Sequence, residues 1–131
     1  MIEASQLGTI RKIDEESLRG LEVLYLELSH ERGFPDAACV DTSKEIVQQL
    51  GFNYAEGHFR LDSPRQGSNL LKPTHAWCED ADGVIIDLTA SQFNSGLEVP
   101  ISKGVQIIKP NTPFYYRYLP LVPRVKRQSS I

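Results

Sequence analysis

Three residues of the chain carry side chains that together could perform nucleophilic catalysis: Cys39, His75 and Asp87. A thiol becomes a thiolate at neutral pH when a neighbouring imidazole stabilises its charge. A carboxylate beside that imidazole fixes its tautomer and its orientation. The three residue types therefore predict a cysteine nucleophile, a histidine acid/base and an aspartate that orients the histidine.

The position of Cys39 along the chain supports this chemistry. Asp36 is a helix start signal, because its carboxylate can accept hydrogen bonds from the first amides of a helix that ends at Gly51. Cys39 then lies in the first turn, where unpaired amides stabilise a thiolate and donate to an oxyanion. The alternative is that Cys39 packs as a small buried residue, as free cysteines often do.

His75 and Asp87 are expected on the two arms of one β-hairpin. The β-rich runs from Thr74 to Asp80 and from Val84 to Thr89 flank the loop Ala81-Asp82-Gly83, with glycine where a left-handed residue is required. In that register His75 is a diagonal neighbour of Asp87 on the same face, with Cβ atoms roughly 7 Å apart. A loop one residue longer or shorter would place them on opposite faces.

The other face of the hairpin is expected to pack against helices. It would carry Ala76, Cys78, Val84, Ile86 and Leu88. Cys78 is therefore predicted to be a core thiol and not a second nucleophile. Asp87 would be costly to bury without a hydrogen-bond donor, which makes His75 its expected partner.

The rest of the pattern predicts an α+β fold in which N-terminal helices pack on an antiparallel sheet. The expected elements are a helix from Asp14 to about Glu31 ended by Gly33, a strand or pair of strands over 52–61 interrupted near Gly57, a polar loop over 62–72, strands over 105–108 and 114–119, and a flexible tail over 120–131.

Composition restricts the class of protein. At 131 residues, with 40% apolar and 24% charged residues, the chain is expected to form one domain, 1–131. A net charge of −3 argues against a nucleic-acid binder held by phosphate contacts. Two cysteines, no signal-peptide pattern and no long apolar stretch predict a cytoplasmic protein with no membrane partner. Secretion of an effector without a signal peptide stays open.

A zinc site is the competing use of these residue types. Its ligands would be Cys39, His58, His75 and Cys78. The spacing is poor, because His75 and Cys78 would project to opposite faces of a strand and no C-x-x-C pair is present. We expect neither a metal nor a cofactor.

The chain resembles known cysteine hydrolases. A cysteine at a helix start followed by histidine and aspartate on successive strands resembles the papain-like and transglutaminase-like superfamily. The segments H-A-W at 75–77 and D-L-T at 87–89 are similar to the H-x-W and D-x-T segments of transglutaminase-like domains. A closer resemblance, over 39–93, is to small bacterial and phage proteins of the YunG-like sort, whose D-L-T-x-x-Q-F block ends here in Gln92 and Phe93.

The resemblance implies a papain-like or transglutaminase-like core with Cys39 as nucleophile, His75 as general acid/base and Asp87 as the orienting residue. It also implies that Trp77 and Gln92 contact the substrate. Holding the turn after the strand is the alternative role of Gln92.

Two positions depart from the pattern of these relatives. They often carry glutamine or glycine before the cysteine and asparagine after H-x-W, whereas this chain has Ala38 and Cys78. The second oxyanion donor is therefore unassigned, and the Cys39 amide is the one donor that we name.

The predicted function is a cysteine-dependent amide hydrolase or acyl transferase that acts on peptide or glutamine amides through a thioester. Its partner would be a protein or peptide substrate. The alternative is a non-catalytic binding module on a transglutaminase-like scaffold, with Tyr115, Tyr116 and Tyr118 as the partner face. Against that alternative, the tyrosines would cover the sheet as core and boundary residues. The oligomeric state is left open.

Overall fold

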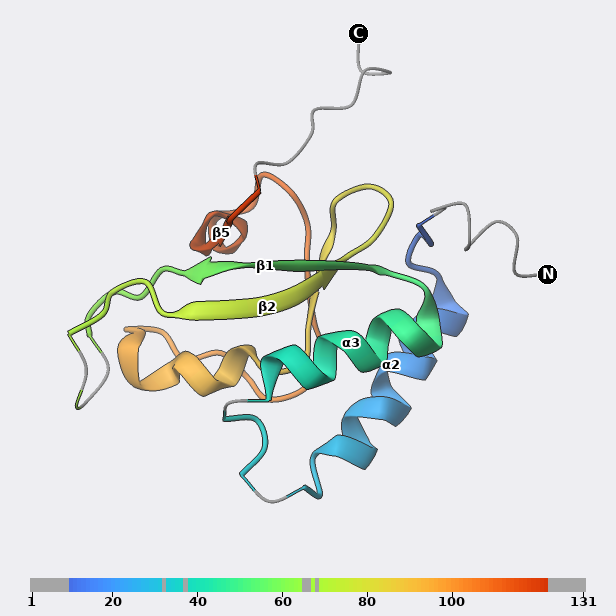
Figure 1. The fold of residues 1–131 in the computed structure, drawn as a ribbon, viewed down its shortest axis with the longest axis horizontal. Helices are drawn as coiled ribbons and strands as arrows, with labels where there is room; N and C mark the ends of the chain where they lie inside the picture. Colours follow the sequence, from blue (N-terminus) through green and yellow to red (C-terminus); the bar gives the residue numbers. More distant parts are fainter. Residues whose placement is uncertain (1–9, 32, 37, 65–66, 68, 123–131) are drawn as a thin grey trace, which may run out of the picture.

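The computed structural model describes residues 10–31, 33–36, 38–64, 67 and 69–122, in which two α-helices precede a five-stranded sheet (Figure 1). The predicted α+β class is confirmed. The elements in chain order are α2 (Glu15–Leu28), α3 (Cys39–Leu50), β1 (Asn53–Phe59), β2 (Thr74–Glu79), β3 (Ile85–Asp87), the 3-10 helix η1 (Ala90–Gly96), β4 (Gln106–Ile108), the 3-10 helix η2 (Pro113–Arg117) and β5 (Tyr118–Pro120).

The strand order is β4-β3-β2-β1-β5, and each described pair is antiparallel. Strands β1 to β4 follow one another as a meander, and β5 then returns to the other edge of β1. The end of the described chain therefore lies beside its first strand. This return brings residues near position 118 to the sheet that carries His75.

The helix α2 begins with a capping box. The carboxylate of Asp14 accepts a hydrogen bond from the Ser17 amide at 2.7 Å, and the Ser17 hydroxyl accepts one from the Asp14 amide at 2.9 Å. Such a cap contributes about 1 kcal/mol. The helix ends at Leu28, a few residues before the predicted end. Its buried residues Leu21 and Leu24 face the sheet side of the molecule.

The start of α3 differs from the prediction that Asp36 caps it. The helix begins at Cys39 with Ala38 as its N-cap, and this residue makes no side-chain capping hydrogen bond. Asp36 lies in the preceding turn, where its amide donates to the Gly33 carbonyl oxygen. The prediction failed because this extra turn separates the aspartate from the helix. The uncapped amides are consequently left at the residue that carries the thiol.

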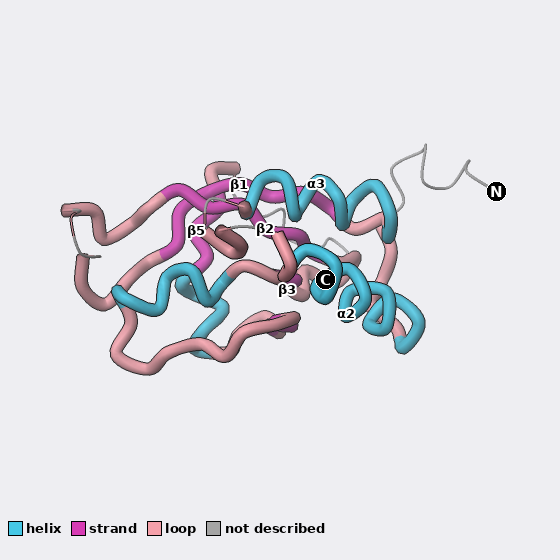
Figure 2. The backbone as a smooth tube through the Cα atoms, turned by 90° about the horizontal axis from the view of Figure 1, so that it is seen from below, coloured by secondary structure: helices cyan, strands magenta, loops and turns pink. Residues whose placement is uncertain are grey.

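The sheet separates two apolar clusters, and α3 runs alongside β1 and β2 on one side of it (Figures 1 and 2). The helix-side cluster contains Leu21, Leu24, Ile46, Phe52, Cys78, Ile86 and Leu88. The far-side cluster contains Phe59, Leu61, Trp77, Ile85, Phe93, Ile108, Tyr115 and Tyr118. The predicted packing of Cys78 against the helices is therefore confirmed, because alternate residues of β2 belong to different clusters.

Strand β1 is continuous through Gly57, so the predicted interruption at this residue is wrong. Gly57 pairs with His75 of β2 on one side and with Pro120 of β5 on the other. A Cβ atom at this position would lie 2.1 Å from the Leu119 carbonyl oxygen. Glycine is required here because β5 approaches the backbone of β1 so closely.

Two predictions for the C-terminal part need correction. The expected strand over 114–119 is instead η2 followed by the short strand β5. Pro120, placed in the flexible tail, belongs to β5, and the Leu121 amide donates to the Glu56 carbonyl oxygen at 2.9 Å. Residues 123–131 of the predicted tail lie outside the described residues. No helix in the described part of the chain is long and apolar enough to span a membrane.

Candidate active site

The hairpin that carries His75 and Asp87 has the predicted register. The Asp80 amide donates to the Val84 carbonyl oxygen at 2.9 Å, and Gly83 has a φ of +82°, in the left-handed region. The ladder pairs Cys78 with Ile86, which makes His75 the diagonal neighbour of Asp87. Loop length and glycine position were sufficient for this prediction because a hairpin loop sets the register of its strands.

His75 and Asp87 form a buried hydrogen-bonded pair. The distance from His75 Nε2 to Asp87 Oδ2 is 2.7 Å, and the two residues are 3% and 2% exposed. The predicted contact is confirmed. Because Nε2 is held by the carboxylate, Nδ1 is the ring nitrogen left to exchange a proton with another group.

Asp87 accepts four hydrogen bonds. His75 Nε2 and the Tyr118 hydroxyl both donate to Oδ2 at 2.7 Å, and the amide and hydroxyl of Thr89 donate to Oδ1 at 2.8 and 3.1 Å. Burial raises the pKa of Asp87, but His75, Tyr118 and the Thr89 amide outweigh it and hold the pKa below its usual value. A buried anion with all these donors is fixed in charge and in orientation.

Tyr118 is a member of this network that sequence reasoning missed. It lies 31 residues after Asp87 and reaches it only because β5 pairs with β1. Burial, then the charge of Asp87, raises the pKa of Tyr118 well above its usual value, so the phenol stays protonated and donates. No local sequence signal distinguishes Tyr118 from Tyr115 or Tyr116.

The thiol of Cys39 lies beside His75 at the start of α3. Burial raises the pKa of the thiol. The neighbouring His75 and the backbone N–H of Ala76 together lower it by more than burial raises it, so that the pKa lies below its usual 9.0. The side chain is half-buried. Cys39 is therefore both partly accessible and placed where a thiolate is stabilised.

The end of β3 explains why the Ala76 amide faces the thiol. Amides alternate in direction along an antiparallel strand, and the Asp80 amide points toward β3. The Ala76 amide points the same way, but β3 ends at Asp87, one residue before the position opposite Ala76. The short strand therefore leaves a main-chain donor for the sulfur of Cys39.

The charge on His75 complements that of Cys39. Burial lowers the pKa of His75, but the carboxylate of Asp87 and then the thiol of Cys39 raise it, to about 9. His75 Nδ1 is buried and has no hydrogen bond of standard geometry to any described residue. The raised pKa of His75 and the lowered pKa of Cys39 both shift the equilibrium toward an imidazolium-thiolate pair, with Nδ1 as the proton carrier.

Aromatic rings hold the imidazole of His75 on its far side. Phe93 contacts it edge-on with ring centroids 4.8 Å apart, and Phe59, Trp77 and Tyr118 lie at 5.8 to 5.9 Å. These contacts limit rotation of the ring. The proton carrier is thereby kept in one orientation.

Trp77 and Gln92, predicted to contact the substrate, have different surroundings. Trp77 is 0% exposed, and its indole Nε1 donates to Glu79 at 2.9 Å. It packs behind His75 and presents no surface to a substrate, so its predicted role needs correction. Gln92 is half-buried on η1, and its Nε2 is a buried donor with no partner among the described residues. Its predicted contact with substrate stays a prediction.

The predicted aromatic face of a binding module is wrong for two of its three residues. Tyr115 and Tyr118 are 9% and 1% exposed and belong to the far-side cluster. Tyr116 is 51% exposed, and its hydroxyl donates to Asn111. The tyrosines therefore cover the sheet as core and boundary residues.

The four side chains of the alternative zinc site are not brought together. Cys78 belongs to the helix-side cluster, whereas His75 contacts Phe93 of the far-side cluster, so the two lie on opposite faces of β2, as the strand parity predicts. His58 Nδ1 is hydrogen-bonded to the Lys72 carbonyl oxygen at 3.0 Å. Within the described residues, no group of three or more His, Cys, Asp or Glu side chains is placed to hold a metal ion.

No protein-family model, curated protein or solved structure matches this chain. The resemblance to transglutaminase-like and papain-like hydrolases stays a prediction from the segments around residues 39, 75 and 87. Any functional assignment accordingly rests on the geometry of the site itself.

Proposed function

We propose that the protein is a cysteine-dependent amide hydrolase or acyl transferase in which Cys39, His75 and Asp87 act as a triad. The observation that carries this proposal is the line of contacts from Asp87 Oδ2 to His75 Nε2, with the remaining ring nitrogen buried and a thiol of lowered pKa beside the ring. A cysteine that serves only to pack the core would not require a hydrogen-bonded His75–Asp87 pair beside it.

The arrangement supports a balanced acyl-transfer sequence. The thiolate of Cys39 attacks the amide carbonyl carbon, a C–S bond forms, and the oxygen takes the negative charge. His75 gives the Nδ1 proton to the leaving nitrogen as the C–N bond breaks, which leaves a thioester. Water or an amine then attacks, His75 accepts its proton, and the C–S bond breaks to release the product and the thiolate.

The start of α3 supplies donors for the oxyanion. Its N-cap residue, Ala38, makes no side-chain capping hydrogen bond, and the positive end of the helix dipole lies at Cys39. An anion on the substrate oxygen is stabilised there at no further reorganisation. The sequence predicted that Asp36 would cap this helix. The lack of that cap leaves the amide donors available for this chemistry.

The first test is the pH dependence of iodoacetamide labelling in the native protein, with each cysteine followed by peptide mass analysis. Cys39 should label well below pH 8 and slow down in His75→Ala, whereas buried Cys78 should stay unlabelled until unfolding. A Cys39 that labels no faster than Cys78 would contradict the proposal.

The second test separates the possible reactions. Glutamine-containing peptides are incubated with the protein, with and without a primary amine. Peptide cleavage, ammonia release and amine incorporation identify a peptidase, a deamidase and a transferase, because the thioester is common and the acceptor differs. Turnover that survives in Cys39→Ala would sink the assignment.

Both cysteines are free, which fits the proposed cytoplasmic location.

A further inference from the structure

A carboxylate, that of Glu56, lies on the strand next to β2. Glu56 of β1 pairs with Ala76, the residue whose amide acts on the Cys39 sulfur. Paired residues of neighbouring antiparallel strands project to the same face. Glu56 therefore projects to the helix side of the sheet, on which α3 begins with Cys39.

Tyr54 holds this carboxylate in place. Its hydroxyl donates to Glu56 Oε2 at 2.7 Å, and its Cα pairs with Cys78, so that both side chains belong to the helix side. Burial, then Glu56, then the charge of Cys39 raises the pKa of Tyr54. The Tyr54 hydroxyl is thus within electrostatic range of the sulfur, and it is hydrogen-bonded to the Glu56 carboxylate.

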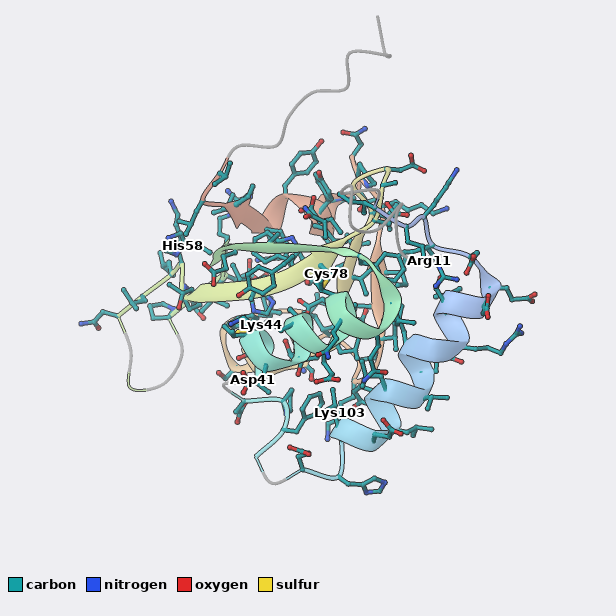
Figure 3. All side chains as sticks on the ribbon, turned by 45° about the vertical axis from the view of Figure 1, so that its right-hand side comes forward. Arg11, Asp41, Lys44, His58, Cys78 and Lys103 are labelled. Carbon is teal, nitrogen blue, oxygen red and sulfur yellow. The ribbon has the colours of Figure 1, made fainter. Side chains whose placement is uncertain are left out.

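The carboxylate of Glu56 is available to a ligand. Its side chain is exposed, and Oε1 has no partner among the described residues. Lys44, labelled on α3 in Figure 3, is exposed as well. Among the described residues, no ion pair joins Lys44 to Glu56. A charge that is oriented in advance by a neighbouring hydroxyl binds an opposite charge with less ordering cost.

We propose that Glu56, oriented by Tyr54, is a subsite for a cationic group of the acyl substrate. The inference rests on the proposed function, since it places this group next to the amide that Cys39 attacks. The substrate class is a peptide or small amide that carries an ammonium or guanidinium group within a few bonds of its acyl carbon. The carboxylate pairs with this group, and the hydroxyl of Tyr54 keeps its orientation.

The test compares two charged thiol reagents on the full chain and needs no known substrate. Trimethylammonioethyl and sulfonatoethyl methanethiosulfonate both convert a thiolate into a mixed disulfide and release methanesulfinate. The ratio of their rates at Cys39 reports the local charge, because thiol ionisation affects both rates equally. Cys39 and Cys78 are followed separately by peptide mass analysis.

Glu56→Gln should lower the cationic-to-anionic rate ratio by about fivefold or more, and Glu56→Lys should lower it further. Tyr54→Phe should lower it about twofold, because the carboxylate stays but loses its orientation. The control is Glu22→Gln, which removes the same charge from an exposed position on α2 and should leave the ratio unchanged. Thermal unfolding of each variant checks that it is folded.

The outcomes separate this inference from the proposed function. A ratio that is unchanged in Glu56→Gln and Glu56→Lys, with Cys39 still reactive, overturns the cationic subsite alone. A Cys39 that fails to react below pH 8 even with neutral methyl methanethiosulfonate overturns both. A ratio that falls in the expected order supports the subsite, and substrates with arginine or lysine near the scissile amide should then be tried first.

Discussion

The two cysteines of the chain have opposite electrostatic surroundings, although one lies on β2 and the other contacts a residue of that strand. Cys39 begins α3, lies beside His75 and an Ala76 amide, and has a lowered pKa. Cys78 lies on β2 among apolar side chains of the helix side, and burial, then the charge of Asp87, raises its pKa to about 12 (Figure 3). Its Sγ donates to the Ser43 carbonyl oxygen at 3.3 Å. The pKa of each thiol is therefore set by the neighbours of its sulfur.

The most severe test of this comparison removes each sulfur in turn. Cys39→Ala should lower acylation of a substrate by about 10⁴-fold or more, because the nucleophile is lost. Cys78→Ala should keep the rate and lower the free energy of unfolding by about 1–2 kcal/mol, through lost packing. Turnover assays and denaturant unfolding check both variants. The comparison fails if the two variants exchange these effects.

The next effect comes from Asp87. Asp87→Asn should lower the acylation rate about 10²–10⁴-fold, because an amide neither stabilises the imidazolium nor fixes its orientation. The pKa of Cys39 should rise as His75 loses its charge, which iodoacetamide labelling against pH measures.

The matched control for that change is Asp80→Asn in the same hairpin. The Asp80 carboxylate accepts from the amides of Ile13, Asp82 and Val84, so its loss should lower stability. It should leave the pH at which Cys39 labels unchanged. Equal shifts in both variants would mean that the hairpin, and not the carboxylate, controls the thiol.

Removal of one hydroxyl should have a smaller effect. Tyr118→Phe keeps the ring but deletes one of the four hydrogen bonds to Asp87. We expect about a tenfold lower rate and a higher pKa of His75, since the carboxylate loses a competing donor. Tyr116→Phe removes an exposed phenol two residues away and should change neither quantity. A pH-rate profile of Tyr118→Phe identical to that of the wild type would contradict this.

The last expected effect is the pH dependence of stability. The pKa of His75 is raised from 6.5 to about 9 in the folded protein, so its contribution to stability is fully present below pH 6.5 and is lost as the pH rises through about 9. The melting temperature should therefore decrease as the pH is raised from 6.5 to about 9. The decrease should be smaller in His75→Gln. The same deprotonation removes the general acid, so the acylation rate should fall on the alkaline side near pH 9.

Local elements of the site were predictable because local interactions define them. The loop 81–83 has the glycine that its turn requires, and strand alternation then places His75 and Asp87 on one face. The same alternation places Cys78 against the helices. The start of α3 was harder to predict, because Asp36 has the chemistry of an N-cap but the chain makes another turn before the helix begins.

The long-range contacts of the site could not be predicted from the sequence pattern. Tyr118 reaches Asp87 only because Gly57 admits β5 close to β1, and nothing near either residue in sequence indicates that pairing. Trp77 shares a strand face with His75, yet the rings of the far-side cluster enclose it completely. Exposure depends on residues distant in sequence, so the predicted substrate contact of Trp77 failed.

The sequence by itself determined which chemical groups are present, the helix that begins near the thiol and the hairpin that pairs His75 with Asp87, because each depends on neighbours a few residues away. Tertiary structure alone decided that Cys39 lies beside His75, that β3 ends early enough to leave the Ala76 amide for the sulfur, and that Tyr118 completes the shell of Asp87. These contacts join separate elements, and their geometry follows from how the sheet packs on the helices and not from any local pattern.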